Sequence, residues 1–549
     1  MTIDYIKHFP YDQIRPEQEA VLKQIAEHWG DKKYFILQLD VGTGKSGIAK
    51  TVANWSKDAF IITETKQLQE QYVHDFGTDP QFVSIKGKAN YQCNKNGRLN
   101  CENGPCNLRK AAGSMPPCMN TCKYYALRKR ALAAHTVLTS YAYIFRAFDC
   151  AGFWKPRQLM AFDECHLIED QLVNFASFEI NPDELDRTYG LFDTQEDRSD
   201  WLRPFKDSGW EKNKDRFKKF FTVITAKREE LWDMLKEELG DVKPEELDTD
   251  TIESMNSTHK LYYKIDKLYK QMDVFYSQRK DNWIVEPNVT DGSLSFTPLF
   301  VDSLFKQFCN NWAEKFLFMS ATILDIDGFI KDLGINKDDC LVIKMESTFD
   351  PAKSPIYFMP CGSMSYQNID ESIPNACEAI GKILKAKRNE KGIIHTGNYK
   401  IAERIWQDFE HIYKDDHDRL LVKQKDNNEI SNQNLIKVHE RSKDTVLVSP
   451  SMTTGVDLRD DLSRFQVVVK MPFSSLADPR IKRKSELSSD WYACQMLKTF
   501  VQACGRSTRS AEDFSSTFVL DSSFAYWINK YKKWLPKQFL ERLKGVTLT

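Results

Sequence analysis

The sequence has almost no net charge, and its pattern predicts neither a leader peptide nor a membrane-spanning run. Its 77 basic and 78 acidic residues leave a formal charge of −1, so binding of a nucleic acid would need locally concentrated positive charge. Residues 1–5 show no basic stretch before an apolar one, and no apolar run reaches about 18 residues. We therefore expect no membrane contact and a cytoplasmic location, where the 13 cysteines are thiols or metal ligands rather than disulfides.

Internal repeats and low-complexity segments are also missing, which excludes a solenoid. The 549 residues, of which 41% are hydrophobic, suffice for about three to four domains of roughly 150 residues each. Strand and helix patterns alternate near both ends of the chain, as is typical of parallel sheets. The expected strands are 34–39, 59–63, 136–139, 159–163 and 316–319, then 392–395, 445–448, 465–469 and 516–520. The expected helices near the start are 16–29, 45–55 and 66–76.

A glycine-rich turn between the first strand and the next helix predicts a phosphate-binding loop. It reads Gly42-Thr43-Gly44-Lys45-Ser46. Backbone N–H groups at the helix start would cradle the phosphates, Lys45 would reach the β- and γ-phosphates, and Ser46 would bind Mg²⁺. The usual pattern has a glycine five residues before Gly44, and Leu39 stands there instead. The alternative interpretation is a chance glycine turn with an exposed lysine.

Two carboxylates, Asp163 and Glu164, end another apolar strand. Asp163 would hold Mg²⁺ directly or through water, and Glu164 would orient and polarise the attacking water. Alone, the pair could equally be a solvated acidic loop. Together with the phosphate loop it predicts ATP hydrolysis.

A third candidate piece lies near the end of the chain, in the stretch from Gln502 to Arg509. If this stretch is helical, Arg506 and Arg509 lie three residues apart on one face. Guanidinium groups suit transferring phosphates, so both arginines and Gln502 are candidate catalytic residues. The alternative is an ordinary pair of surface charges.

The order of these motifs resembles that of superfamily-two helicases, and within them of the XPD/DinG-like group. Asp163-Glu164-Cys165-His166 resembles the group's Asp-Glu-Ala-His box, with cysteine in place of alanine. The other matching segments are Arg15 to Gln18 (adenine-facing), Leu39 to Ser46, Thr63 to Leu68, Ser320-Ala321-Thr322, Gly392 to Tyr399, Thr453 to Asp457, Lys470 to Phe473 and Gln502 to Arg509. In this group a glutamate usually precedes the glycine of the fifth motif, where Thr454 stands here. The resemblance covers nearly the whole chain.

The resemblance implies an α/β fold of two RecA-like P-loop lobes with parallel sheets. It also implies a cysteine-rich iron–sulfur insert and a helical arch insert, both in the first lobe. Gln18, Gly455 and Asp457 become candidate nucleotide-binding residues. The expected boundaries are 1–85, 131–180 and 291–345 for the first lobe, 86–130 for the iron–sulfur domain, 181–290 for the arch and 346–549 for the second lobe.

Five cysteines fall within 30 residues, where an even distribution of 13 would place about 0.7. They are Cys93, Cys101, Cys106, Cys118 and Cys122. The family resemblance makes Cys93 and Cys122 the first and last ligands of a 4Fe–4S cluster. For the middle positions we choose Cys106 and Cys118, with Cys101 as the alternative. Zinc remains a rival, since nothing in the spacing excludes it, and so does a metal-free relic of the insert.

Basic and aromatic residues crowd the segment after the last of these cysteines: Tyr124, Tyr125, Arg128, Lys129 and Arg130. This mixture suits single-stranded DNA, with cations on phosphates and rings on bases. The alternative is a solvated helix face.

The resemblance implies an ATP-dependent DNA helicase that moves 5′ to 3′ on single-stranded DNA and unwinds forked or junction substrates, with ATP, Mg²⁺ and a 4Fe–4S cluster. Two other functions stay open: a P-loop protein that binds nucleic acid and switches on ATP without unwinding, and the motor of a helicase–nuclease system. Because the motor begins near Arg15, we expect no N-terminal nuclease. We expect a monomer in a bacterial cell or a virus-infected host cell. The sequence does not distinguish DNA from RNA as the substrate.

Overall fold

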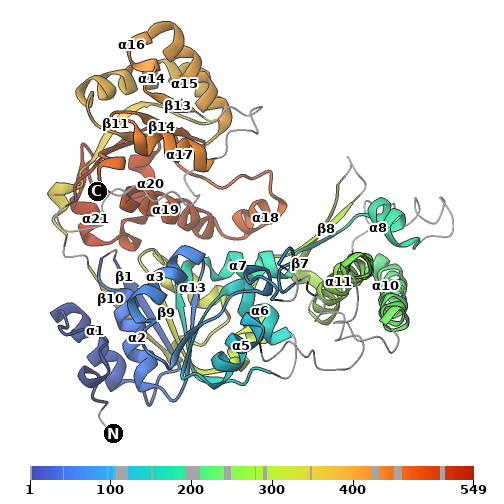
Figure 1. Cartoon of the computed structure of the whole chain (residues 1–549). Helices are drawn as coiled ribbons and strands as arrows, with labels where there is room; N and C mark the ends of the chain where they lie inside the picture. The colour runs from blue at the N-terminus through green and yellow to red at the C-terminus, as the bar shows by residue number, and fades with distance from the viewer. Residues whose placement is uncertain are drawn as a thin grey trace. The chain divides into compact units, whose positions relative to one another are not determined.

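The computed structural model describes residues 3–40, 42–94, 97–102, 104, 121–149, 153–191, 210–239, 249–278, 280–288, 293–346, 349–422, 432–450, 460–506 and 513–548. The chain divides into two compact units (Figure 1). The first comprises Met1–Ile36, Ser46–Met319 and Phe329–Leu341, and the second Leu37–Lys45, Ser320–Gly328 and Val342–Thr549. Within the described residues, no helix combines the length and the apolar character needed to cross a bilayer.

The first unit contains all or part of each strand of a seven-stranded sheet in the order β10-β1-β9-β5-β2-β4-β3. Its strands are β1 (Tyr34–Leu39), β2 (Ala59–Thr63), β3 (Phe82–Ser84), β4 (Thr136–Ser140), β5 (Arg157–Asp163), β9 (Ala313–Ser320) and β10 (Cys340–Met345). Helices connect them: α1 (Pro16–Glu27), α2 (Lys45–Trp55), α3 (Lys66–Phe76), α5 (Lys123–Ala133), α6 (Tyr141–Asp149), α7 (Ile168–Ala176), α12 (Asp302–Phe308) and α13 (Ile326–Asp332). All six residues of β1 are buried, as expected for a parallel strand covered on both faces.

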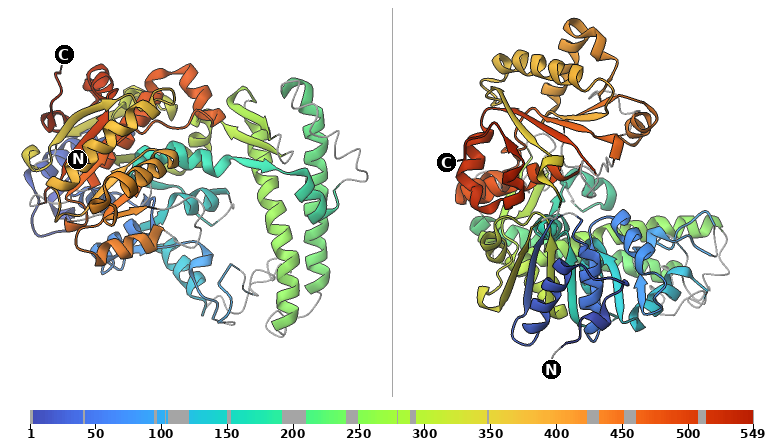
Figure 2. Two further views of the ribbon diagram at one scale, coloured as in Figure 1. Left: turned by 90° about the horizontal axis from the view of Figure 1, so that it is seen from above. Right: turned by 90° about the vertical axis from the view of Figure 1, so that its left-hand side faces the viewer.

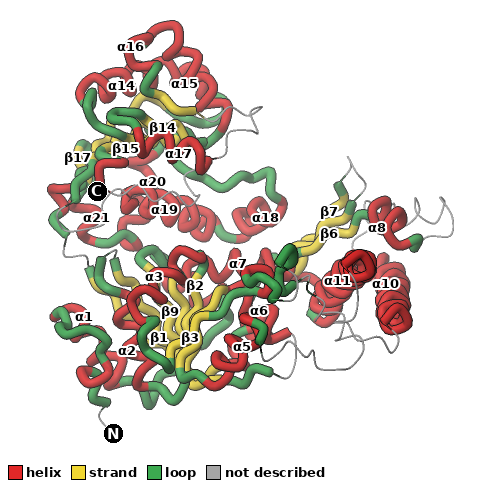
Figure 3. Tube along the Cα trace, in the orientation of Figure 1, coloured by secondary structure: helices red, strands yellow, loops and turns green. Residues whose placement is uncertain are grey.

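The second unit contains a parallel sheet, whose strands are drawn in yellow in Figure 3. Its strand order is β13-β14-β12-β15-β16-β11-β17. Its strands are β11 (Ile356–Gly362), β12 (Gly392–His395), β13 (Leu420–Val422), β14 (Val446–Ser449), β15 (Phe465–Val468), β16 (Ser516–Asp521) and β17 (Leu543–Lys544). Its helices are α14 (Ile369–Ala386), α15 (Tyr399–Ile412), α16 (Lys414–His417), α17 (Asn432–Arg441), α18 (Pro479–Leu487), α19 (Ser489–Arg506), α20 (Phe524–Tyr531) and α21 (Lys537–Glu541).

Side chains alternate between the two faces of this second sheet. Val467 belongs to the core formed with α14 and α15, whereas Val468 belongs to the core formed with α19 and α20. Because successive strand residues point to opposite faces, one apolar strand supplies both cores. The predicted fold class of two parallel α/β lobes is confirmed.

The helical region predicted for 181–290 contains a pair of long helices and also strands that the pattern did not predict. α10 (Trp210–Leu239) and α11 (Thr249–Ser277) run side by side (Figure 2), after the short α8 (Pro182–Tyr189). A small antiparallel sheet adjoins them, made of β6 (Phe178–Ile180), β7 (Trp283–Pro287) and β8 (Leu294–Pro298). The Phe296 ring lies 4.5 Å from that of Phe178, 5.5 Å from that of Phe217 and 5.0 Å from that of Phe275. One aromatic core therefore fixes the helix pair to this sheet.

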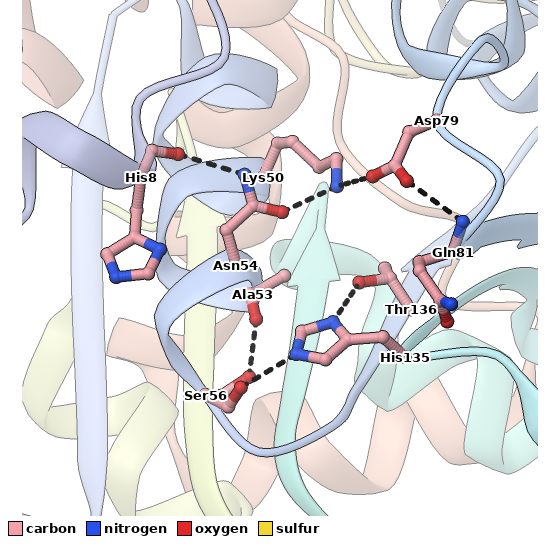
Figure 4. A network of polar contacts seen from close by, with 9 residues as sticks. All are labelled: His8, Lys50, Ala53, Asn54, Ser56, Asp79, Gln81, His135 and Thr136. Carbon is pink, nitrogen blue, oxygen red and sulfur yellow. Dashed lines mark hydrogen bonds and ion pairs between the residues drawn. The ribbon is translucent and has the colours of Figure 1, made fainter.

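The helix α2, which follows the phosphate loop, is anchored by a buried polar network (Figure 4). The Lys50 ammonium donates to Asp79 at 2.7 Å and to Asn54 at 2.5 Å, and the Asn54 amide donates to the His8 carbonyl at 2.9 Å. A buried ammonium needs such partners, since an unpaired charge out of water is costly. The pKa of the Asp79 carboxyl is lowered, because its contacts with Lys50 outweigh the opposing effect of burial. The network ties α2 to the α3–β3 turn and to the N-terminal segment.

Candidate active site

The phosphate loop has the backbone that its glycines predict. Gly42 and Gly44 have φ of 81° and 77°, a left-handed conformation that glycine adopts without strain. The Thr43 hydroxyl donates to the Asp40 carbonyl at 2.8 Å, and the Lys45 ammonium donates to the Leu39 carbonyl at 3.3 Å. Since α2 begins at Lys45, its first N–H groups have no helical partners and are available to an anion.

The unusual Leu39 has a structural explanation. It is the last residue of β1 and is fully buried. The strand continues to the position where a longer loop would carry a glycine. The departure from the usual pattern therefore lies in the length of the strand and leaves the two left-handed glycines in place.

Gln18 lies beside the first turn of α2. Its side-chain oxygen accepts a hydrogen bond from the Arg15 N–H at 3.1 Å, and it is 4% exposed. A Cβ placed on Gly47 would come within 3.9 Å of the Gln18 amide and 3.0 Å of the Tyr11 ring. Burial and then the charge of Asp75 raise the pKa of Tyr11, and the Ser46 side chain opposes that rise. The sequence did not single out Tyr11, since a lone tyrosine before a helix carries no distinctive pattern.

The acidic pair stands at the end of β5, as predicted, with Asp163 as the last residue of the strand and Glu164 directly after it. Asp163 is 3% exposed, and both of its carboxylate oxygens accept hydrogen bonds. The Tyr72 hydroxyl donates to one oxygen at 2.9 Å, and the Glu164 N–H donates to the other at 3.0 Å. Burial first, and then the Asp163 charge, raise the pKa of Tyr72 well above its usual value. Tyr72 therefore stays protonated and keeps its donor role at any physiological pH.

Glu164 has an unusual backbone. Its φ of 54° and ψ of 48° are left-handed, a conformation that costs a non-glycine residue about 1–2 kcal/mol. Its carboxylate lies 3.3 Å from the His166 imidazole. A strained backbone that persists at a carboxylate next to a metal-ligand candidate is typical of catalytic loops. Neither Tyr72 nor the role of His166 was predicted, because both depend on contacts made in the folded state.

Sheet order brings these pieces to one edge. β1, β9 and β5 are consecutive in the sheet, so the phosphate loop, Ser320 and the Asp163–Glu164 pair follow neighbouring strands. Carboxyl ends of parallel strands are where α/β folds bind ligands. The Ser320 hydroxyl accepts from the Thr322 N–H at 3.1 Å, which shapes the turn after β9.

In the second unit, α19 carries the predicted Gln502. Its amide donates to the Thr322 hydroxyl at 2.9 Å, a contact inside this unit because Ser320–Gly328 belongs to it. Arg506 is the last residue of α19. The predicted Arg509, Gly455 and Asp457 lie outside the described residues. The structure thus joins the Ser-Ala-Thr segment to the helix that leads to the candidate arginines.

Three of the five clustered cysteines lie in the described part of the chain, and all three are buried: Cys93, Cys101 and Cys122. A short bridge between Gln92 and Asn100 brings the first two together, and the sulfurs of Cys101 and Cys122 lie 3.7 Å apart. Cys106 and Cys118, our choices for the middle ligands, lie outside the described residues. Within the described residues, no group of three or more metal-binding side chains is assembled.

The rings predicted to stack on bases are turned inward. Tyr124 and Tyr125 are each 6% exposed. The Arg128 guanidinium lies 4.8 Å from the Tyr125 ring centre, and the Lys88 ammonium lies 5.5 Å from it. The expectation that these tyrosines stack on bases is wrong, because α5 packs this face against the protein. The cations of α5 that remain exposed are Lys123, Lys129 and Arg130.

Comparison with known proteins gives matches in both halves of the chain. The family profile "Helicase C-terminal domain" matches residues 380–542, and the profile "DEAD_2" matches residues 100–185. A probable ATP-dependent helicase of Methanocaldococcus jannaschii is 22% identical over 96% of this chain and 94% of its own length. A regulator of telomere elongation helicase 1 homolog of Oryza sativa subsp. japonica is 25% identical over 18% of this chain and 12% of its own length.

Solved structures share the fold. A structure titled XPD helicase has a TM-score of 0.63 at 15% identity and covers 95% of this chain and 98% of its own. A structure titled as Xpd4 of S. tokodaii has a TM-score of 0.56 at 14% identity, with 96% and 99% covered. At these identities the likeness to solved structures shows the fold alone. The similarity to helicases rests on the two family profiles and on the archaeal relative.

Proposed function

Since the chain is an ATP-dependent, XPD/DinG-like superfamily-two helicase, we propose that it moves 5′ to 3′ along single-stranded DNA and unwinds forked or junction duplexes. The observation that carries this proposal is the edge of the first sheet. A phosphate loop, a Ser-Ala-Thr turn and a carboxylate pair follow three consecutive strands there. The DNA substrate and the polarity rest on the resemblance of the motifs.

For ATP hydrolysis we assign roles to side chains of this chain. Lys45 and the first N–H groups of α2 bind the phosphates, while Ser46 and Asp163 hold Mg²⁺. Tyr72 and the Glu164 N–H orient the Asp163 carboxylate, each through one oxygen. Glu164 orients the attacking water, and its contact with His166 fixes the carboxylate. We propose that Gln18 and Tyr11 contact the base of ATP.

For coupling to movement we propose the Thr322–Gln502 hydrogen bond. Thr322 follows β9, whose neighbours β1 and β5 carry the ATP residues, and Gln502 lies on α19, which ends at Arg506. A change of phosphate state at the sheet edge would thereby reach α19. We propose that Arg506 and Arg509 supply positive charge to the transferring phosphate.

The described part of the cysteine segment fits a metal group held by thiolates. Buried thiols from Cys93, Cys101 and Cys122 suit thiolate ligation. The 3.7 Å between the Cys101 and Cys122 sulfurs is close to the ~3.8 Å edge of a tetrahedron with metal–sulfur bonds of about 2.3 Å. In a 4Fe–4S cluster each thiolate binds its own iron, so this pair would have to separate. The sulfur spacing supports Cys101, the alternative to Cys106 and Cys118, as a metal ligand.

We propose that this segment holds a structural metal group. The family resemblance implies a 4Fe–4S cluster, whereas the spacing of the Cys101 and Cys122 sulfurs favours zinc. The group would supply rigidity to the segment before α5, and no step of ATP hydrolysis depends on it. The remaining ligands would come from the clustered cysteines outside the described residues. We further propose a monomer that works in the cytoplasm.

A strand-displacement assay tests the function. Purified full-length protein receives ATP, Mg²⁺ and a labelled duplex with either a 5′ or a 3′ single-stranded overhang. We expect displacement with the 5′ overhang and ATP turnover that rises with single-stranded DNA. If ATP turnover is indifferent to DNA and neither overhang supports displacement, the helicase proposal fails and the ATP-switch alternative stands.

A variant pair ties that activity to the phosphate loop. Lys45→Ala should lower ATP turnover about a hundredfold or more, because the transferring phosphate loses a positioned cation. The control Lys57→Ala removes an exposed lysine just beyond α2 and should retain full activity. Normal turnover in Lys45→Ala would refute the assignment of the loop.

A further inference from the structure

One tyrosine in the second unit, Tyr366, has an unusually solvent-exposed side chain. Tyr366 is 87% exposed, more than any other large hydrophobic side chain of the described residues; the next, Ile412, is 68% exposed. Its exposed neighbours Ser365, Gln367 and Asn368 are polar. An isolated ring among polar groups does not form the contiguous apolar patch that protein partners use.

The loop that presents Tyr366 is held in place. It follows β11, and Met364, two residues before the tyrosine, is 1% exposed. The Ser372 hydroxyl donates to the Ser363 carbonyl at 2.9 Å, and the Asn368 N–H donates to the Ser365 carbonyl at 3.2 Å. The ring is therefore presented by a fixed turn, and little ordering is needed before it can bind a ligand.

A cation lies beside this ring, and a second exposed ring precedes that cation in the sequence. The Lys400 ammonium lies 5.8 Å from the Tyr366 ring centre, and Tyr399 is 45% exposed. Lys400 also lies 3.7 Å from Asp370, but both side chains are more than 60% exposed, so water screens that pair. Tyr366 follows β11 and Tyr399 follows β12 of one parallel sheet, so both lie at its carboxyl edge.

We propose that Tyr366 is a base-stacking residue for single-stranded DNA, with Lys400 contacting the adjacent phosphate. An exposed, fixed ring beside a cation is the arrangement that binds single strands without sequence preference, because every base has a π-face. The inference rests on the proposed function and adds to it a specific contact that no sequence motif identified. It also replaces the stacking role first predicted for Tyr124 and Tyr125.

Fluorescence anisotropy with labelled oligothymidylate tests the contact on the full-length protein. Tyr366→Ala should weaken binding about tenfold, while Tyr366→Phe, which keeps the ring, should stay within about twofold of wild type. Tyr526→Ala is the matched control, because Tyr526 is also exposed, at 58%, but lies on α20. It should bind as wild type, and the ATP turnover of all three variants without DNA should be unchanged.

Salt dependence separates the ring from the cation. Tyr366→Ala should keep the wild-type slope of log affinity against log salt, whereas Lys400→Ala should reduce the slope by about 0.7, the contribution of one phosphate contact on a single strand. Photocrosslinking with an oligonucleotide that carries 5-iodouracil should place the crosslink on the peptide of Tyr366.

The outcomes distinguish this inference from the function on which it rests. If wild-type protein does not bind oligothymidylate, the proposed substrate fails. If wild type binds and Tyr366→Ala binds equally well, or if Tyr366→Phe is as weak as Tyr366→Ala, only the stacking contact is refuted.

Discussion

The hydrogen bond from Tyr72 to Asp163 offers a sharp test of the active site. Replacing Tyr72 with phenylalanine keeps the buried ring and removes only the hydroxyl, which donates to a carboxylate oxygen at 2.9 Å. Hydrogen bonds to charged groups contribute about 1.5–3 kcal/mol, equivalent to roughly a 10- to 100-fold effect. Since the Glu164 N–H still holds the other oxygen, we expect the lower end, about tenfold.

The effect should appear in the Mg²⁺ dependence of ATP hydrolysis. If Asp163 holds Mg²⁺, a carboxylate that has lost its orienting donor binds the metal less well, and the half-saturating Mg²⁺ concentration rises about tenfold in Tyr72→Phe. The assay is steady-state ATP turnover at saturating single-stranded DNA over a Mg²⁺ titration. Binding of DNA, measured separately by anisotropy, should not change.

Tyr141→Phe is the matched control. Tyr141 is also fully buried and also meets Asp163, but its hydroxyl donates to the main-chain carbonyl, at 3.4 Å. This variant should lose some stability and keep the Mg²⁺ midpoint. An unchanged midpoint in Tyr72→Phe, or equal shifts in both variants, would show that the carboxylate is not positioned by Tyr72.

Three further outcomes follow from the described contacts. Because Glu164 is left-handed, Glu164→Gly should unfold with about 1–2 kcal/mol more free energy than Glu164→Ala in urea titrations, while neither variant hydrolyses ATP; equal stabilities would refute the strain. Burial, and then the nearby Lys391, lower the pKa of His439 below its usual 6.5, so the folded state holds it neutral. The contribution of the neutral imidazole to stability is complete above about pH 6.5 and is lost as the pH drops. The melting temperature should therefore decline from pH 7 to 5, and it should decline less steeply in His439→Gln. In anaerobically purified protein, metal analysis with visible absorbance should find iron and sulfide or zinc, and Cys101→Ser should lower the metal content while the buried Cys309→Ser, outside the cluster, keeps it.

Much of the fold was predictable because its signals are local. The strands Tyr34–Leu39, Ala59–Thr63 and Gly392–His395, and the helices Lys45–Trp55 and Lys66–Phe76, have the predicted bounds. Uninterrupted apolar runs mark strands buried on both faces, and two glycines before a lysine mark the phosphate loop. The short strands at the sheet margins and the antiparallel sheet beside the helix pair escaped prediction, since their pairing partners lie far away in the sequence.

The sequence by itself determined the order of the motifs and the α/β class, and it marked candidate phosphate-binding and acidic residues, because local patterns carry each of these signals. Only the tertiary structure decided which side chains meet. Tyr72 reaches Asp163 across 91 residues, and Gln502 reaches Thr322 across 180. Packing buries Tyr124 and leaves Tyr366 exposed, although both tyrosines have polar neighbours in the sequence. Burial and pairing depend on the neighbours that the folded chain supplies, and no local pattern carries that information.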